Sequence, residues 1–137
     1  MKNTADFRTG RHCVFVLHVH LVFVTKYRRK VLTEAAHKTL RAIFVHICQA
    51  FEARLVEANG EDDHVHLLVE YPPKVALSKL VNSLKGVSSR RLRQQHGEIA
   101  ARYYKGVLWS SSYFAASCGG APLSIIRQYI EDQRNTL

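Results

Sequence analysis

The amino-acid sequence predicts an α+β fold in which helices pack against one antiparallel sheet. Residues 13–25 (CVFVLHVHLVFVT) are rich in β-branched and aromatic residues and hold no glycine or proline. This composition is typical of a central strand that is buried on both faces. Hydrophobic residues in 33–51 and 75–95 instead recur with helical spacing. The resulting order of strand, helix, strand, strand, helix, strand, helix predicts a ferredoxin-like split βαβ sheet with an additional C-terminal helix.

The segment after the first strand predicts a turn and then a helix. Residues 26–32 (KYRRKVL) form a basic turn. Thr33 can cap a helix that runs to about Phe51, because its hydroxyl can accept a hydrogen bond from the first helical turn. One face of that helix carries the apolar residues Leu40, Ile43, Phe44, Ile47 and Phe51.

A hairpin is predicted next. Residues 53–58 (ARLVEA) form a short strand, and Asn59-Gly60 provides a strong turn signal. Residues 61–63 complete the loop, and residues 64–71 form the return strand, which Pro72-Pro73 ends.

The second half of the chain predicts a helix over residues 75–95, with Leu77, Leu80, Val81 and Leu84 facing inward. Residues 106–116 (GVLWSSSYFAA) form the last strand. Gly119-Gly120 breaks the chain, and Pro122 suits the first turn of a final helix at about 121–135. Because the sequence holds no repeat, linker or low-complexity segment, we expect one domain over residues 1–137.

Composition excludes several classes of protein. The 137 residues are 47% hydrophobic, which is too apolar for a disordered chain. No apolar run reaches the roughly 18 residues of a membrane span, and the N-terminus lacks the apolar segment of a signal peptide. Cys13, Cys48 and Cys118 have no CxxC spacing, which argues against a disulfide framework and a zinc–thiolate site. We expect a cytoplasmic protein with buried, reduced thiols.

Net charge points to a polyanionic partner. Twenty lysines and arginines face eleven aspartates and glutamates, for a formal net charge of +9. Phosphate contacts are expected from a basic turn around Tyr27, made of Lys26, Arg28, Arg29 and Lys30. They are also expected from a stripe on the second helix, made of Lys79, Asn82, Gly86, Arg90 and Arg93, with Lys85, Ser89 and Arg91 beside it. The alternative is that these helix residues bind no phosphate and are only exposed to solvent.

Four aromatic residues near the last strand are candidates for stacking on unpaired bases: Tyr103, Tyr104, Trp109 and Tyr113. Of these, we expect Trp109 and Tyr113 to pack the last strand instead.

The tripeptide HVH occurs twice, at residues 18–20 and 64–66. Residues two apart on a strand share a face, so either pair can aim two imidazoles at one metal ion. Most histidines in apolar strands are merely packed or hydrogen-bonded, so the position on the strand must decide. The first pair lies within a long apolar strand, whereas His64 and His66 begin theirs, beside a polar loop where a scaffold presents chemistry. We therefore predict His64 and His66 as metal ligands, and we keep His20 as a candidate support for them.

The last helix carries Tyr129 and Gln133 four residues apart, on one helical face. Tyr129 is either a packing residue or a nucleophile, and in the second case Gln133 would offer its amide oxygen to the metal. A phenol with a pKa near 10 is a poor nucleophile at neutral pH, so a metal beside the scissile phosphate would have to assist.

Five motifs, in this order, resemble the small tyrosine transposases of bacterial insertion sequences, the TnpA type of the HUH nuclease superfamily. They are KYRRKVL, DHVHLLVEYPPK, LKGVSSRRL, LWSSSYF and IRQYIEDQ. The resemblance covers about residues 12–133. It implies that His64 and His66 form the HUH motif, with Asp63 as the neighbouring acid. It also implies that Tyr129 is the catalytic tyrosine and Gln133 a metal ligand.

The resemblance further implies an activity. Such enzymes cut and rejoin single-stranded DNA at insertion-sequence ends with Mg²⁺ or Mn²⁺, through a 5′-phosphotyrosine intermediate, and recognise subterminal hairpins. They act as homodimers whose active sites can be shared between subunits, in the nucleoid of bacteria or archaea. Two alternatives remain: a relative that processes chromosomal repeated hairpins, and a non-catalytic nucleic-acid-binding module.

Overall fold

The computed structural model describes residues 8–9, 14–15, 17–103, 105–117 and 123–133. Its strands are β1 (Arg8–Thr9), β2 (Val14–Phe15), β3 (His18–Val24), β4 (Arg54–Glu61), β5 (His64–Glu70) and β6 (Phe114–Ser117). Its helices are the 3-10 turn η2 (Lys26–Arg28), α1 (Glu34–Ala50), α2 (Leu77–Gln95), α3 (Gly97–Arg102) and α4 (Leu123–Asp132). The main sheet has the order β4-β5-β3-β6 with every pair antiparallel. The predicted α+β, ferredoxin-like class is confirmed.

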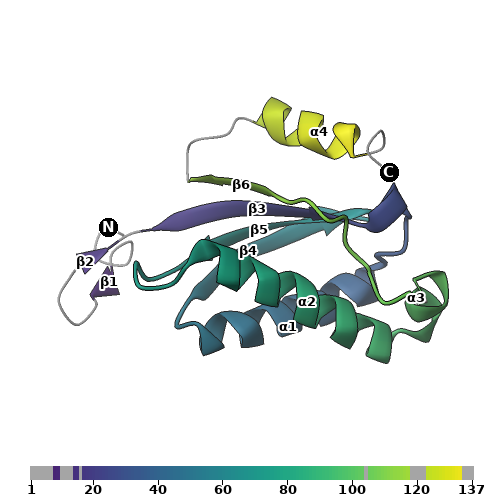
Figure 1. Ribbon diagram of the computed structural model, residues 1–137, viewed down its shortest axis with the longest axis horizontal. Coiled ribbons are helices and arrows are strands. Elements are labelled where there is room, and N and C mark those ends of the chain that lie inside the picture. Colours follow the sequence, from purple (N-terminus) through teal and green to yellow (C-terminus); the bar gives the residue numbers. More distant parts are fainter. Residues whose placement is uncertain (1–7, 10–13, 16, 104, 118–122, 134–137) are drawn as a thin grey trace.

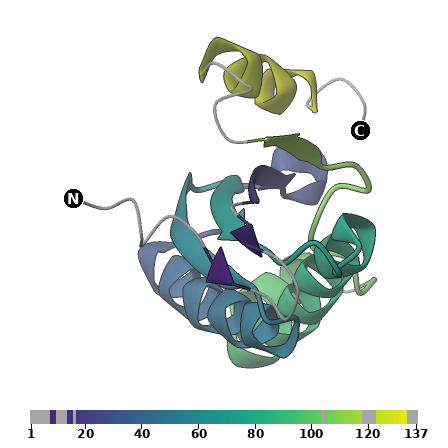
Figure 2. The same cartoon turned by 90° about the vertical axis from the view of Figure 1, so that its left-hand side faces the viewer.

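The molecule has three layers (Figure 1). Helices α1 and α2 cover one face of the sheet, and α4 lies over the other face; Figure 2 shows the same separation from the side. The large core lies between the sheet and α1 and α2, where alternate residues of β3 (Val19, Leu21, Phe23) are buried. The opposite face of β3 presents Val22 and Val24 to a smaller cluster beneath α4.

The predicted long strand over residues 13–25 is wrong at its N-terminal end. β2 pairs with β1 in a separate two-stranded sheet, and β3 begins only at His18. β3 does lie between β5 and β6, so its predicted central place is confirmed. Continuous hydrophobicity predicts burial, but it carries no signal for a change of pairing partner between two strands.

The predicted Asn59-Gly60 turn is also wrong. Both residues belong to β4, which continues to Glu61, and the chain reverses at Asp62-Asp63. Gly60 is needed for a different reason: a Cβ built there would lie 2.3 Å from the carbonyl oxygen of His64 and 2.8 Å from Cε1 of His37. Because Gly60 has no side chain, the backbone of β5 and His37 of α1 can lie close to it. The sequence alone does not distinguish a glycine needed for such close packing from a glycine in a turn.

The first helix agrees with its prediction. The Thr33 hydroxyl accepts a hydrogen bond from the Ala36 amide at 3.1 Å, and α1 ends at Ala50. The predicted inward residues of α1 are buried except Phe51, which is partly buried.

The second half of the chain differs more. Helix α3 was not predicted, and β6 covers only four residues instead of the whole of 106–116. Before β6, Trp109 makes one isolated bridge to Thr25. Helix α4 lies within its predicted range, and Pro122 falls outside the described residues.

Two further sequence expectations concern burial. Cys48 is buried, and burial raises the pKa of its thiol to about 11, as expected for an inert core cysteine. Cys13 and Cys118 lie outside the described residues. In the described part of the chain, no helix is long and apolar enough to cross a membrane.

Candidate active site

His64 and His66 lie at the start of β5, on the face that α4 covers. The intervening Val65, with Leu67 and Val69, points into the main core and fixes the strand. Strand geometry therefore turns both imidazoles to the same side, as the sequence pattern predicts. Both side chains are partly buried beside the Asp62-Asp63 reversal.

Asp63 orients His64. Its Oδ1 lies 2.8 Å from Nδ1 of His64, and its Oδ2 accepts a hydrogen bond from Nε of Arg28 at 3.0 Å. The hydrogen bond with His64, and then the Arg28 guanidinium, hold the pKa of the Asp63 carboxyl below its usual value although burial opposes them. An ionised Asp63 only accepts hydrogen bonds, so Nδ1 of His64 is the donor, and a neutral His64 ring then has its lone pair on Nε2 for a ligand.

His20 contacts His66 directly. Nδ1 of His20 lies 2.9 Å from Nε2 of His66, with ring centroids 5.1 Å apart. Burial, followed by the neighbouring His20, lowers the pKa of His66, which favours the neutral imidazole that a metal requires. The structure thus places His20 against a predicted ligand. His18 lies instead 3.5 Å from Oε2 of Glu70, away from the pair.

Helix α4 packs on the same side of the sheet as the histidines. Tyr129 and Ile130 contact the cluster formed by Val22 and Val24, and the Tyr129 ring lies 5.6 Å from that of Phe114. Arg28, which binds Asp63, also lies 3.7 Å from Oε1 of Glu131. One guanidinium therefore connects the carboxylate that orients His64 to the helix that carries Tyr129.

A short chain of hydrogen bonds joins Tyr129 to Gln133. Ser112 Oγ lies 2.8 Å from the Tyr129 hydroxyl and donates to Oε1 of Gln133 at 3.1 Å. A serine has one hydroxyl proton, so the phenol must donate to Ser112 while Ser112 donates to Gln133. Burial raises the pKa of Tyr129, and the hydrogen bond with Ser112 offsets part of that effect. Tyr129 is therefore a neutral phenol in this arrangement near pH 7.

Gln133 is buried, with 5% of its surface exposed, and its Oε1 also accepts a hydrogen bond from Ser110 at 2.8 Å. The Ser110 amide in turn donates to the carbonyl of Val24 at 2.7 Å, and Val24 is the pairing partner of His64. Gln133 and His64 are thus joined through one serine and one strand pair. Two serines occupy the amide oxygen, so Gln133 must give up one of them before it can ligate a cation.

The loop that holds these serines is fixed by Lys85. Its ammonium donates to the carbonyls of Ser110, Ser111 and Ser112 at 2.8, 3.2 and 3.1 Å. Burial lowers the pKa of Lys85. Sequence reasoning assigned Lys85 to DNA and gave Ser110 and Ser112 no role. The only available signal was the polar run SSS inside a segment otherwise read as a strand.

The predicted basic stripe of α2 divides into two groups. Lys79, Asn82, Gly86 and Arg90 are exposed and can meet a DNA backbone. Arg93, like Lys85, points to internal partners: it donates to the Ser89 hydroxyl at 3.4 Å and the Gly106 carbonyl at 3.1 Å.

The other basic cluster lies at η2, where Lys30 is exposed and Lys26, Arg28 and Arg29 are partly buried. Tyr103 and Trp109 are buried, so the expectation that Tyr103 stacks on bases is wrong. Tyr104 lies outside the described residues.

The fold and the residues of this site have the arrangement that the sequence resemblance implies. A ferredoxin-like sheet carries a histidine pair on one face, and a helix over that face carries a tyrosine and a glutamine one turn apart. Within the described residues, no cluster of three or more His, Cys, Asp and Glu side chains could hold a metal. The third ligand predicted for His64 and His66 is the amide of Gln133, which is not one of these side-chain types.

Comparison with known proteins gives the family. Residues 13–133 match the family described as "Transposase IS200 like", so the chain belongs to the IS200-like transposases. It is 32% identical to the transposase for insertion sequence element IS200 of Salmonella typhimurium over 128 residues, covering 93% of this chain and 84% of that protein. It is 30% identical to the ISDra2 transposase TnpA of Deinococcus radiodurans over 130 residues, covering 95% of this chain and 93% of the relative.

Solved structures agree with this assignment. A crystal structure of a protein from Deinococcus radiodurans R1, assigned as a transposase, superposes with a TM-score of 0.82 at 32% identity. The superposition covers 92% of this chain and 97% of that one. A REP-associated tyrosine transposase bound to a REP hairpin gives a TM-score of 0.55 at 12% identity, covering 90% and 68% of the two chains. This second likeness extends to the fold alone.

Proposed function

We propose that this transposase cuts and rejoins single-stranded DNA at insertion-sequence ends through a 5′-phosphotyrosine on Tyr129, with a divalent metal bound by His64, His66 and Gln133. One observation carries the proposal. The Tyr129 hydroxyl and the Gln133 amide oxygen are both hydrogen-bonded to Ser112. Tyr129 lies on the helix that packs over the face presenting the histidines. A tyrosine that served only to pack the helix would not need a hydrogen bond from its hydroxyl to Ser112, the serine that also binds the predicted ligand Gln133.

The chemistry is a transesterification. The Tyr129 oxygen attacks the scissile phosphorus, the bond to the 3′ oxygen breaks, and that oxygen leaves with a proton as a 3′-hydroxyl. The phenol proton passes to water, the leaving 3′ oxygen takes up a proton from water, and the Ser112 hydroxyl can turn to donate to the phenolate before it attacks. One phosphodiester is exchanged for another, so a 3′-hydroxyl can later reverse the reaction without ATP.

The residues present fit a divalent cation. Asp63 leaves the Nε2 lone pair of His64 free, and burial keeps His66 neutral. A bound cation would polarise the phosphate and stabilise the charge that develops on its oxygens. Mg²⁺ prefers an all-oxygen shell, whereas Mn²⁺ also accepts imidazole. We therefore expect half-maximal activity at a lower concentration of Mn²⁺ than of Mg²⁺.

The DNA partner is proposed from charge and kinship. The exposed residues Lys79 and Arg90 on α2, together with Lys30 beside η2, can neutralise phosphates in a chain of net charge +9. A tyrosine transposase of the same fold binds a REP hairpin. We propose that the present protein binds hairpins near the element ends, and that it works on DNA in the cytoplasm of its cell.

We further propose a homodimer, with Mg²⁺ or Mn²⁺ as cofactor. Tyr129 lies over its own sheet here, and in the dimer its helix would serve either its own or the partner histidines. Mixing Tyr129→Phe with His64→Ala separates these arrangements. Shared sites would restore cleavage in the mixture, because one of the two mixed sites is intact, whereas unshared sites would leave it inactive.

Single-stranded DNA from the two flanks of the gene tests the function. With Mn²⁺ present, we expect cleavage of one strand near a flanking hairpin, lost in Tyr129→Phe and in His64→Ala while both variants still bind. Cleavage of scattered chromosomal hairpin repeats, with none at the flanks, would favour the repeat-processing alternative. Binding with no cleavage of any strand would favour the non-catalytic module.

A further inference from the structure

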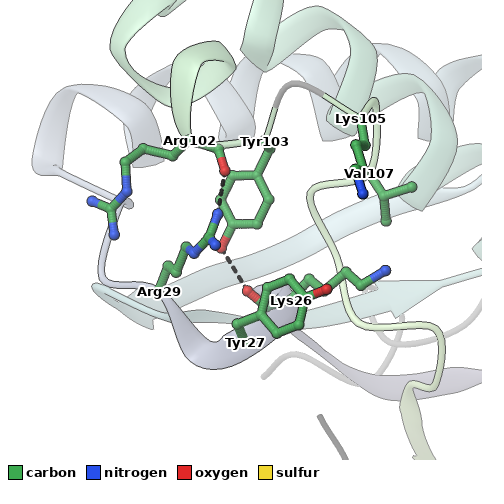
Figure 3. Close-up of a pocket in the computed structure, with 7 residues that line it drawn as sticks. All are labelled: Lys26, Tyr27, Arg29, Arg102, Tyr103, Lys105 and Val107. Carbon is green, nitrogen blue, oxygen red and sulfur yellow. Dashed lines mark hydrogen bonds between the residues drawn. The ribbon is translucent and has the colours of Figure 1, made fainter.

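A cavity of about 180 Å³ lies beside the basic turn, outside the site described above (Figure 3). It is lined by Lys26, Tyr27, Arg29, Arg102, Tyr103, Lys105 and Val107. None of these described lining residues is acidic. The volume is below the roughly 300–1,000 Å³ of pockets for drug-sized ligands, so the cavity suits one planar group with an anion attached.

The turn presents Tyr27 in an unusual way. Tyr27 and Arg28 both adopt left-handed backbone conformations, with φ of 64° and 50°, which cost energy for residues other than glycine. The Tyr27 side chain is 52% exposed, although it is a large aromatic ring. The Tyr103 hydroxyl holds the turn in place by donating to the Lys26 carbonyl at 2.7 Å.

Cations surround the exposed ring. Arg29 lies between two tyrosines, with its guanidinium carbon 5.0 Å from the centre of Tyr27 and 5.2 Å from that of Tyr103. Its Nη1 also donates to the Arg102 carbonyl, which fixes the guanidinium (Figure 3). The Lys26 ammonium lies 5.5 Å from the centre of the Tyr27 ring. An aromatic ring and a planar guanidinium among lysines are the groups that bind unpaired bases and their phosphates.

The turn is fixed to the active site. Thr25 donates its amide to the Asp63 carbonyl at 2.9 Å, and Leu32 donates to the Asp62 carbonyl at 2.9 Å. Between them, Arg28 binds the Asp63 carboxylate. Tyr27 is therefore one residue from the arginine that braces the His64 hairpin.

We propose that this cavity binds one unpaired nucleotide that flanks the scissile phosphate, with its base stacked on Tyr27 and its phosphate held by Lys26 and Lys105. The inference rests on the proposed function and adds to it a defined nucleotide subsite. It differs from the general basic surface because it predicts a contribution from an aromatic ring at a single position of the strand.

The test measures binding of fluorescein-labelled single-stranded DNA from the gene flank, which carries the hairpin and the expected cleavage site, to the Tyr129→Phe protein in EDTA, so that no cleavage intervenes. Tyr27→Ala should weaken affinity about 5- to 150-fold, since stacking on one base contributes about 1–3 kcal/mol, and Tyr27→Phe should bind like the parent. An abasic site placed at successive positions should weaken binding to the parent at one position. With the DNA that carries the abasic site at that position, Tyr27→Ala should bind no more weakly than the parent protein.

A charge control uses two lysines. Lys105→Ala should reduce the slope of log affinity against log salt by about 0.7 for its one phosphate contact. Lys74→Ala removes the same charge from the exposed ion pair with Glu52 and should leave the slope unchanged. Val107→Glu places a carboxylate in the cavity without touching the turn, and it should weaken binding even if Tyr27→Ala folds poorly.

Equal affinity of Tyr27→Ala and Tyr27→Phe, both folded by circular dichroism, would overturn the nucleotide site. If Tyr27→Ala weakens DNA binding as expected but the wild-type protein forms no covalent adduct with DNA, the proposed chemistry is overturned and the nucleotide site is still supported.

Discussion

The hydroxyl of Ser112 lies 2.8 Å from the phenol oxygen of Tyr129 and 3.1 Å from the amide oxygen of Gln133. One exposed serine thus connects the predicted nucleophile to a predicted metal ligand. Its single proton can serve Gln133 while the phenol is neutral, or the phenolate once Tyr129 has ionised. The serine therefore changes partner during the proposed reaction.

Ser112→Ala removes this hydrogen bond and should lower the single-turnover cleavage rate about 2- to 12-fold, as expected for about 0.5–1.5 kcal/mol. The pKa of Tyr129 should rise further, because the variant has burial without the offset from serine. Ser111→Ala is the matched control, since the contact of Ser111 with Lys85 is made by its backbone carbonyl. Equal rates in the two variants would exclude a role for the Ser112 hydroxyl.

Asp63→Asn should destabilise the fold by about 1.5–3 kcal/mol at pH 7, because it removes the charge that Arg28 and His64 bind. The folded pKa of Asp63 lies below the unfolded value of about 3.9. Its contribution is therefore complete well above pH 3.9 and is lost as pH falls through the folded pKa. Denaturant unfolding of wild type and variant should converge in that acidic window. A difference that is independent of pH would contradict this account.

His20→Asn should weaken Mn²⁺ binding about 10- to 100-fold, because His20 is hydrogen-bonded to His66 and orients its ring. His18→Asn provides the comparison on the same strand face, since His18 faces Glu70. Calorimetric titration of Mn²⁺ into each variant checks the prediction. Unchanged affinity in His20→Asn would return His20 to an ordinary packing role.

Lys85→Met should lower both the unfolding free energy, by about 1.5–3 kcal/mol, and the cleavage rate, because the loop of Ser110 and Ser112 loses its ammonium donor. Lys79→Met on the exposed side of α2 should stay within about 0.5 kcal/mol of wild type. Hydrogen exchange at residues 110–112 should accelerate only in the first variant. A variant that loses DNA affinity but keeps this loop protected would support the predicted contact of Lys85 with DNA.

Local chemistry predicted much of the fold. The cap at Thr33 follows from its hydroxyl group. The buried face of α1, and the placement of His64 and His66 opposite Val65, follow from periods of 3.6 and 2 that the sequence displays directly. The failures required knowledge of neighbours. Gly60 reads as a turn until the carbonyl of His64 is seen against it, and residues 13–25 read as one strand until β2 is seen to pair elsewhere.

The candidate site divides in the same way. Tyr129 and Gln133 share a helical face because of their spacing, and Asp63 adjoins His64 in the sequence. Contacts between distant segments carry no such signal. Three contacts depend on the tertiary fold: the hydrogen bond of His20 with His66, the ion pair of Arg28 with Glu131, and the hydrogen bonds from Lys85 to the loop of residues 110–112. A lysine on an exposed stripe and a lysine turned inward look identical in the sequence.

The covalent intermediate tests the central claim most directly. The protein, incubated with Mn²⁺ and single-stranded DNA from the gene flanks and then digested with trypsin, should yield the peptide of residues 128–134 with the 3′-side DNA fragment attached to Tyr129. Label on the 3′ side of the cut should remain with the protein, while the 5′ fragment leaves with a free 3′-hydroxyl. Tyr129→Phe should yield no adduct. Cleavage without an adduct in wild type, or an adduct that persists in Tyr129→Phe, would contradict the assignment of Tyr129 as nucleophile.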